Sequence, residues 1–269
     1  MEFLTILLSG LLGLVSPAGL VIDRIALDAI RSQFKKVQEL QVRVDNVPSY
    51  QLLQGKVERV RIAGRGLQLK RQDIRIAALE LETDPIVFKL RSFRQKKPKL
   101  ERPFQAGMRL VLTEQDINQA LKSPKLAARL RNLRISKLPR PAGGSQRYDL
   151  VNPRVEFLEA NRLRFQVELT QGDVKPLAIT VESGLGVVAG RQIQLVEPVI
   201  SANGQAVPNQ LVSAIATNIS KLLNLSNLEL YGLRARLIKL KVSQDKLEIA
   251  AFLRVEPSFR VLENRRSSI

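Results

Sequence analysis

The chain has 269 residues, 45% of them hydrophobic, which is enough for one large domain or two modest ones with a real core. Its net charge of +18 and pI near 10.7 attract anionic partners, either nucleic acid or acidic lipid headgroups. It contains no His and no Cys, which removes the commonest general base and excludes thiol nucleophiles, disulfides and zinc–thiolate sites. The lack of Trp and an aromatic content of 4% argue against a stacking platform for single-stranded nucleic acid.

An uncharged apolar segment, residues 3–22, is about as long as a bilayer-spanning helix. Residues 16–18 (Ser-Pro-Ala) are compatible with a signal-peptide cleavage site, although Glu2 stands where such a peptide is positively charged. The basic residues within 24–36 suit an uncleaved anchor that leaves the body in the cytoplasm. The segment also fits the buried start of a long helix. We expect residues 1–19 to be a leader, either a signal peptide or an anchor.

The first half of the chain alternates between helical and strand patterns. Apolar residues at helical spacing predict an amphipathic helix over residues 21–37. Alternating apolar residues then predict strands between residues 40 and 88, and a slip of their phase at residues 77–78 indicates a β-bulge and a bent strand. Thr113 and the acidic residues after it are typical of a helix N-cap with an acidic first turn.

The second half consists mainly of long alternating segments. Strands predicted around residues 155–169 flank a hairpin turn at residues 159–162, and Pro208 opens an amphipathic helix. A final hairpin pairs residues 238–242 with residues 247–255. Because helices and strands do not follow βαβ alternation, the sequence predicts an α+β protein built on antiparallel meanders.

Candidate catalytic groups are missing from this pattern. The acidic residues occur singly, and neither a phosphate loop nor a nucleophile elbow is recognisable. Without His the usual catalytic triad cannot be assembled. We therefore expect a protein that is not an enzyme, with no catalytic residue, no metal ligand and no cofactor.

A strongly basic region covers residues 89–140, where fifteen lysines and arginines stand against three acidic residues. Its densest part is either a solvated loop or a contact for acidic headgroups, because each basic side chain near an anionic membrane contributes about 1 kcal/mol. The candidate headgroup contacts are Arg94, Lys96, Lys97 and Lys99.

The alternating strands also have two interpretations. Their apolar residues face an ordinary core, or the sheet curls around an apolar space that holds a ligand. On the second interpretation the candidate lining residues are Phe165, Val167, Leu169, Ile179, Val181, Ile238 and Leu240.

Several stretches resemble the bacterial LmeA-like phospholipid-binding family. They are a helix at residues 25–34, the segments 42–44, 47–55, 60–62 and 66–67, and a strand-to-helix step at residues 112–121. The likeness extends over residues 20–255. It implies a long curved antiparallel sheet wrapped around amphipathic helices, akin to the tubular lipid-binding fold of bactericidal/permeability-increasing (BPI) proteins. It also implies phospholipid binding in an apolar groove at the cell envelope, and export.

The leading prediction is a non-enzymatic phospholipid-binding or lipid-transfer protein that acts at an anionic membrane. Acyl chains would occupy the groove, with headgroups near basic residues. A membrane-tethered structural or assembly factor without bound lipid is the alternative, and a nucleic-acid-binding protein is a third, for which no motif is present.

We expect one domain over residues 20–257 and a tail at residues 258–269. The expected location is the cell envelope, exported or anchored, with the cytoplasmic face as the alternative.

Overall fold

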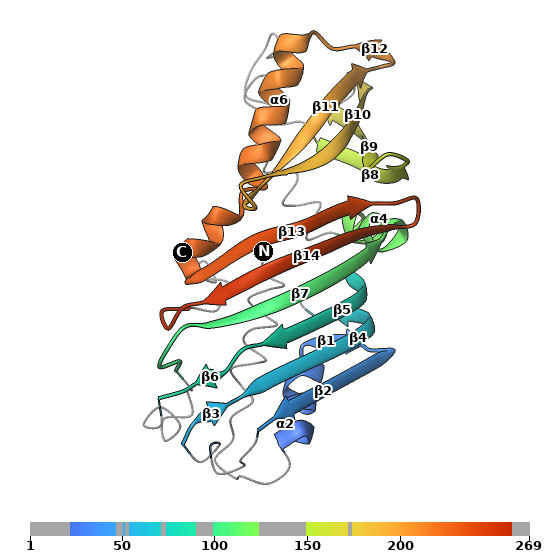
Figure 1. Cartoon of the computed structure of the whole chain (residues 1–269). Coiled ribbons are helices and arrows are strands. Elements are labelled where there is room, and N and C mark those ends of the chain that lie inside the picture. Colours follow the sequence, from blue (N-terminus) through green and yellow to red (C-terminus); the bar gives the residue numbers. More distant parts are fainter. Residues whose placement is uncertain are drawn as a thin grey trace, which may run out of the picture.

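The computed structural model describes residues 22–46, 51, 54–70, 74–89, 99–123, 149–171 and 174–259. The predicted leader at residues 1–19, the basic residues Arg94, Lys96 and Lys97, and most of the predicted tail lie outside these residues. The described chain is rich in antiparallel strands and has few helices, which is broadly compatible with the predicted α+β class. Its strands divide into two main open sheets, one above the other in Figure 1, and not into one continuous sheet.

The larger sheet has seven strands in the order β1-β4-β5-β7-β14-β13, with β2 also paired to β4. The strands are β1 (Phe34–Lys36), β2 (Glu39–Asp45), β4 (Arg59–Leu69), β5 (Arg75–Thr83), β7 (Phe104–Thr113), β13 (Leu233–Val242) and β14 (Lys246–Val255). The helix α2 (Ile22–Arg31) packs against β2. Two short strands, β3 (Lys56–Val57) and β6 (Ile86–Val87), pair separately.

The smaller sheet has five strands in the order β12-β11-β10-β9-β8. The strands are β8 (Asp149–Leu158), β9 (Arg162–Gln171), β10 (Val174–Val188), β11 (Gln192–Ala202) and β12 (Gln205–Ala206). The helix α6 (Asn209–Leu222) lies along β11 (Figure 1). The 3₁₀ helix η2 (Leu225–Tyr231) then leads back into β13.

Each main sheet has an apolar and a polar face, because side chains alternate along its strands. In the larger sheet Val60, Ile62 and Leu81 are at most 3% exposed, whereas their neighbours Arg61 and Glu82 are exposed. We call the apolar face of each sheet its inner face and the opposite face its outer face. The inner face of the larger sheet contributes to the main core, against which α2 packs through Ala26 and Ile30.

The helix predicted over residues 21–37 is shorter than expected. It ends at Arg31, and the Ser32 hydroxyl donates to the Ala29 carbonyl at 2.6 Å just beyond its last turn. The chain then forms β1, where Phe34 pairs with Leu69 and is 5% exposed. The prediction was wrong for its last residues because Phe34 fits the helical period but gains more burial in the sheet.

The predicted phase slip in β5 is present, but the predicted bulge is not. Burial shifts from Ile76 to Leu79, yet the pairing of β4 with β5 continues without a register shift on either side of Ala77. The partner strand changes phase at the same level, because Gly66 adopts a left-handed φ of 57° there. Because the side chains of β4 and β5 switch faces at the same level, the pairing continues without the extra residue of a bulge.

The helix α4 (Glu114–Leu121) joins the two sheets. Its start is the predicted N-cap, since the Thr113 side chain accepts from the Asp116 backbone and the Asp116 carboxylate accepts from Thr113, which completes a capping box. Asn118 on this helix both donates to the Val155 carbonyl and accepts from the Val155 N–H, each at 2.7 Å. These bonds satisfy the backbone of Val155 in β8, the end strand of the smaller sheet.

Two turns of the smaller sheet contact the edge strand β13 of the larger one. The Asn161 side chain, in the turn between β8 and β9, accepts from the Val242 N–H at 2.6 Å. The Gly190 carbonyl, in the turn between β10 and β11, accepts from the Leu237 N–H at 2.7 Å. The hairpin ends of one sheet therefore cover part of the open edge of the other.

Candidate functional site

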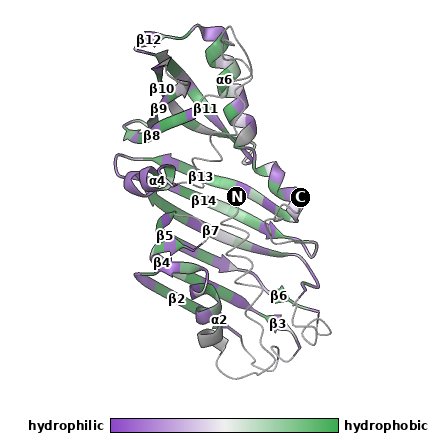
Figure 2. Cartoon of the chain, turned by 180° about the vertical axis from the view of Figure 1, so that it is seen from behind, coloured by the Kyte–Doolittle hydropathy of each residue, from purple (hydrophilic) through white to green (hydrophobic). Residues whose placement is uncertain are grey.

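The inner face of the smaller sheet is apolar but incompletely buried. Val167, Val181 and Ile200 are buried on it, whereas Phe165 and Ile179 retain partial exposure. Hydrophobic and hydrophilic residues follow one another along the strands (Figure 2). Because side chains alternate between the two faces of a sheet, the hydrophobic ones gather on this face. A sheet face with half-exposed apolar side chains offers a surface for an apolar ligand.

Phe165 connects two hydrophobic clusters on this face. It packs on the junction cluster, in which Phe157 of β8 meets Leu121 of α4 and Val242 of β13. It also packs on the cluster that Val212 of α6 forms with the sheet. The apolar face is therefore continuous from α6 to the boundary between the two sheets.

The larger sheet extends this surface beyond the boundary. Leu247 of β14 packs on the junction cluster, and the next residue on the same face, Ile249, is half-buried. Ile249 pairs with Leu240 on one side and Leu110 on the other, and both are half-buried as well. We call the half-buried set the apolar inner surface, and its members are Phe165, Ile179, Leu185, Leu195, Leu240, Ile249 and Leu110.

Most of the predicted lining residues come together on these inner faces. Phe165 pairs with Val181 and Val167 with Ile179, so the pairs lie side by side on the smaller sheet, and Leu169 follows on the same face. Leu240 lies on the inner face of β13.

Ile238 lies apart from the other predicted lining residues. It is left unpaired where the register shifts between Leu237 and Lys239, and it is 73% exposed. Whether any of the seven residues contacts a lipid stays a prediction.

Four residues of the apolar inner surface were missing from the sequence prediction. Leu185, Leu195, Leu110 and Ile249 all lie in alternating segments, so the signal for an apolar face was present in each. What the sequence lacked was the pairing of Leu110 with Ile249, which are far apart along the chain. Alternation assigns a side chain to a face but does not identify the neighbouring strand.

The predicted headgroup contacts are represented in the described chain by Lys99 alone. It is exposed, and its carbonyl accepts from the Lys89 N–H at 2.8 Å. An isolated bridge between Phe88 and Leu100 brings together the residues on either side of segment 90–98, the basic loop expected from the sequence. Arg94, Lys96 and Lys97 belong to this segment, outside the described residues.

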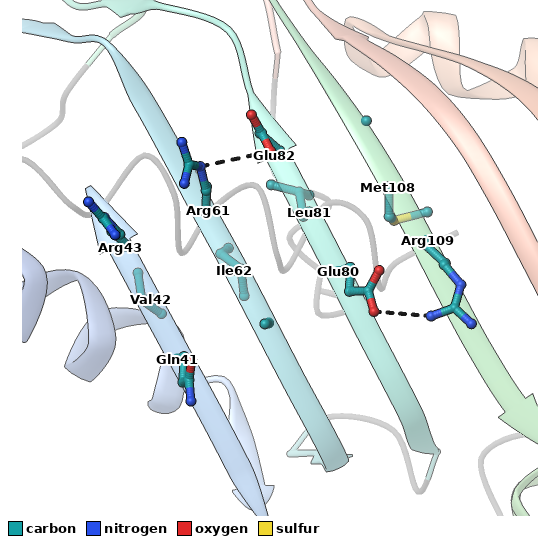
Figure 3. Close-up of a pocket in the computed structure, with 12 residues that line it drawn as sticks. Gln41, Val42, Arg43, Arg61, Ile62, Glu80, Leu81, Glu82, Met108 and Arg109 are labelled. Atoms are coloured by element: carbon teal, nitrogen blue, oxygen red, sulfur yellow. Dashed lines mark hydrogen bonds and ion pairs between the residues drawn. The ribbon is translucent and has the colours of Figure 1, made fainter. Parts of the chain in front are cut away.

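The outer face of the larger sheet contains a shallow depression with a volume of about 740 Å³ (Figure 3). Ala63 and Gly107 lie among its lining residues, and a Cβ added to Gly107 would meet no atom within 4 Å. Charged side chains surround these small residues, and Arg61 contacts Asp45 at 2.9 Å and Glu82 at 3.8 Å. Because charged side chains border it, this depression is a poor match for an acyl chain. Because carboxylates of the protein already neutralise cations such as Arg61, it is also a poor match for an anionic headgroup.

Glu248 is the most strongly perturbed acid near this face. Its carboxylate accepts from Arg109 Nε at 2.7 Å and from Lys239 Nζ at 3.0 Å. The hydrogen bond from Arg109, followed by that from Lys239, lowers the pKa of Glu248 from 4.5 to about 2. The same contact raises the pKa of Arg109. The three charges hold β7, β13 and β14 together across the sheet.

Replacing Glu248 with Gln should remove a pH-dependent part of the stability. A carboxylate whose pKa is depressed on folding stabilises the folded state above pH 4.5, and this contribution disappears as the pH falls towards 2. Denaturant unfolding of wild type and Glu248→Gln should differ most above pH 5 and converge near pH 2. Asp245→Asn serves as a control because Asp245 makes no ion pair within the described part of the chain. A gap between wild type and Glu248→Gln that stays constant with pH would contradict the account.

The described residues contain no group of three or more His, Cys, Asp or Glu side chains that could hold a metal ion. Among the same residues, no helix combines the length and apolarity needed to span a bilayer.

In a comparison with known protein families, a family model described as LmeA-like phospholipid-binding matches residues 15–252. No curated protein and no solved structure matches the chain.

Proposed function

The chain belongs to the LmeA-like phospholipid-binding family, and from this membership we propose that it holds a phospholipid with its acyl chains against the apolar inner surface. The observation that carries the proposal is the continuity of this surface across both sheets through Phe165. Its half-buried side chains make a site for an acyl chain, since each buried CH₂ contributes about 0.8 kcal/mol.

The dimensions of the surface suit this ligand. A strand of ten residues such as β9 extends about 33 Å, because a strand rises about 3.3 Å per residue. One leaflet of a bilayer has an apolar depth of about 15 Å, half of its 30 Å hydrocarbon core. An acyl chain laid along the inner face would therefore fit within the length of the strands.

The headgroup, on this proposal, lies near the basic loop and its cations Arg94, Lys96, Lys97 and Lys99. The triple variant Lys96→Gln, Lys97→Gln, Lys99→Gln should weaken binding to vesicles of phosphatidylglycerol by about 3 kcal/mol, on the basis of about 1 kcal/mol per cation. Vesicle sedimentation measures the change. The matched control neutralises three exposed lysines elsewhere, Lys35, Lys36 and Lys70. If the two triple variants lost the same amount of vesicle binding, the cations of the basic loop would not be headgroup contacts.

We further propose that residues 20–257 form one lipid-binding domain of the tubular type found in BPI proteins, preceded by the leader and followed by the tail. The hydrogen bonds that Asn118, Asn161 and Gly190 make between the two sheets support a single domain. The family match over residues 15–252 crosses both sheets, which supports it as well. With an exported or anchored leader, the protein would act at an anionic membrane of the cell envelope.

We infer a binding or transfer role without catalysis, because the family is named for phospholipid binding and the sequence contains no His or Cys. Mass spectrometry of an organic extract of the purified protein tests the proposal, with co-purifying phospholipid as the expected result. An empty extract together with no retention on vesicles of acidic lipid would contradict it. A membrane-tethered assembly factor would give retention on vesicles with an empty extract.

A further inference from the structure

The outer face of the edge strand β13 has an unbalanced positive charge. The strand carries four basic residues and no acidic one, and Arg234, Arg236, Lys239 and Lys241 all lie on its outer face. Lys239 contacts Glu248 at 3.0 Å. Arg234, Arg236 and Lys241 make no ion pair and no side-chain hydrogen bond with any of the described residues. Their charge is therefore available to a partner.

The opposite half of the same face is charge-balanced. Each of Arg43, Arg59, Arg61 and Arg65 on the outer face of β2 and β4 contacts an acid of the same face. Glu80 of β5 contacts Arg109 of β7. Arg43 and Arg61 share Asp45, and Arg59 contacts Glu82 at 3.3 Å. The difference between the two halves is local, so the free cations of β13 are not explained by the basic composition of the chain alone.

Two exposed apolar side chains accompany these cations. Ile238 is 73% exposed at the register shift of β13, flanked by Lys239. Phe252 is 40% exposed on the outer face of β14, between Arg236 and Gly107 in the sheet register. A β-bulge can turn a side chain away from its regular face, which accounts for the exposure of Ile238. Apolar side chains surrounded by cations are typical of a surface that enters the interface of an anionic bilayer.

We propose that this strip, made up of Arg234, Arg236, Ile238, Lys239, Lys241 and Phe252, is the surface by which the protein docks on an anionic lipid bilayer. Its cations contact lipid phosphates, and Ile238 and Phe252 enter the interfacial layer. The choice of a bilayer as the partner rests on the proposed phospholipid-binding function. The exposed aliphatic and aromatic groups also favour lipid over nucleic acid, whose backbone is contacted by polar and charged side chains.

A single tryptophan tests the position of the strip, since the chain has no Trp of its own. In the full-length Ile238→Trp variant, emission should shift to shorter wavelength with vesicles of equal parts phosphatidylcholine and phosphatidylglycerol. Brominated phosphatidylcholine in the same vesicles should quench it. Gln41→Trp, at an exposed outer-face position on the balanced half, should give neither effect. No shift at position 238, or the same shift at both positions, would overturn the proposal.

A charge variant tests the role of the cations. Because each basic side chain near an anionic surface strengthens binding about fivefold, Arg234→Gln, Arg236→Gln, Lys241→Gln together should weaken vesicle binding on the order of a hundredfold and flatten its salt dependence. The control is Arg43→Gln, Arg59→Gln, Arg65→Gln, with the same charge change on the balanced half, and it should bind at least about tenfold more tightly than the strip variant. Equal losses, or a response of Ile238→Trp to duplex DNA but not to vesicles, would overturn the proposal.

Measuring the phospholipid content of the purified proteins tests the docking surface and the proposed function independently. The strip variant should co-purify with as much phospholipid as wild type, since the strip lies on the outer face. A wild-type protein that docks through the strip but contains no phospholipid would contradict the proposed function alone. A protein that contains phospholipid but docks equally well without the strip cations would contradict the docking surface alone.

Discussion

Ile179→Asp is expected to lower the phospholipid content of the purified protein by at least about tenfold, because an unpaired carboxylate against an acyl chain costs several kcal/mol and each 1.4 kcal/mol is a factor of ten. Ile179 is half-buried on the inner face of β10, between Val167 and Ala202. A charge at this position would lie within the apolar inner surface. Phosphorus analysis of the extracted lipid per mole of protein measures the effect.

The neighbouring residue provides the control. Thr180 is also half-buried on β10, but it lies on the outer face between Gln166 and Ser201. Thr180→Asp should keep the wild-type phospholipid content. Leu240→Asp repeats the test on the larger sheet and should lose lipid as Ile179→Asp does. If the variants at Ile179 and Leu240 are folded by circular dichroism and keep their lipid, acyl chains do not lie on this surface.

Asn118→Ala should lower the free energy of unfolding by about 2–6 kcal/mol, because it leaves two partly buried backbone groups without partners at about 1–3 kcal/mol each. The Asn118 amide supplies both the donor and the acceptor for Val155, and no neighbouring strand replaces it at the end of the smaller sheet. Denaturant unfolding followed by circular dichroism gives the measurement.

Gln119→Ala is the matched control, since Gln119 is exposed on the same helix. It should change the free energy of unfolding by no more than about 0.5 kcal/mol, the usual range for surface substitutions. If Asn118→Ala matched this control, the Asn118 bonds would not be holding β8 to α4. That role would then fall to Glu114 of α4, whose carboxylate accepts from the Phe157 N–H at 2.8 Å. The phospholipid content of Asn118→Ala is informative too, because weakening the junction should disturb the surface that crosses it.

Features determined by neighbouring residues were predictable from the sequence. Thr113 and Asp116 lie three residues apart, and the N-cap formed where it was expected, as part of a capping box. The turn at residues 159–162 contains Asn161 with a left-handed φ of 60°, a conformation that Asn adopts more readily than most residues. In both places the local spacing carried the necessary information.

Features that depend on distant residues were not predictable. Nothing near Asn161 indicates that its side chain accepts from Val242, 81 residues away, and this bond connects the two sheets. The alternation of Ile238, Leu240 and Val242 predicts a common face, but the chain shifts register between Leu237 and Lys239, where Leu237 bonds to Gly190 of the other sheet. A tertiary contact therefore accompanies the break in the local pattern and leaves Ile238 exposed.

In the candidate site, too, local features were predictable and features that depend on distant residues were not. Alternation assigned Phe165 and Ile179 to an apolar face, but only the packing of Phe165 on two clusters shows that this face reaches the larger sheet. The sequence does not distinguish the free cations of β13 from paired ones, because Arg234 and Arg61 lie in similar alternating segments. Arg61 has an acid on a neighbouring strand and Arg234 has none, and this difference depends on the register.

The most direct test of the central claim is native mass spectrometry of the full-length protein after incubation with phospholipid vesicles and removal of unbound lipid. We expect a mass increment equal to a whole number of phospholipids on wild type and Thr180→Asp, and the unliganded mass for Ile179→Asp. The unliganded mass for all three proteins would contradict phospholipid binding, and equal increments on all three would contradict its location on the apolar inner surface.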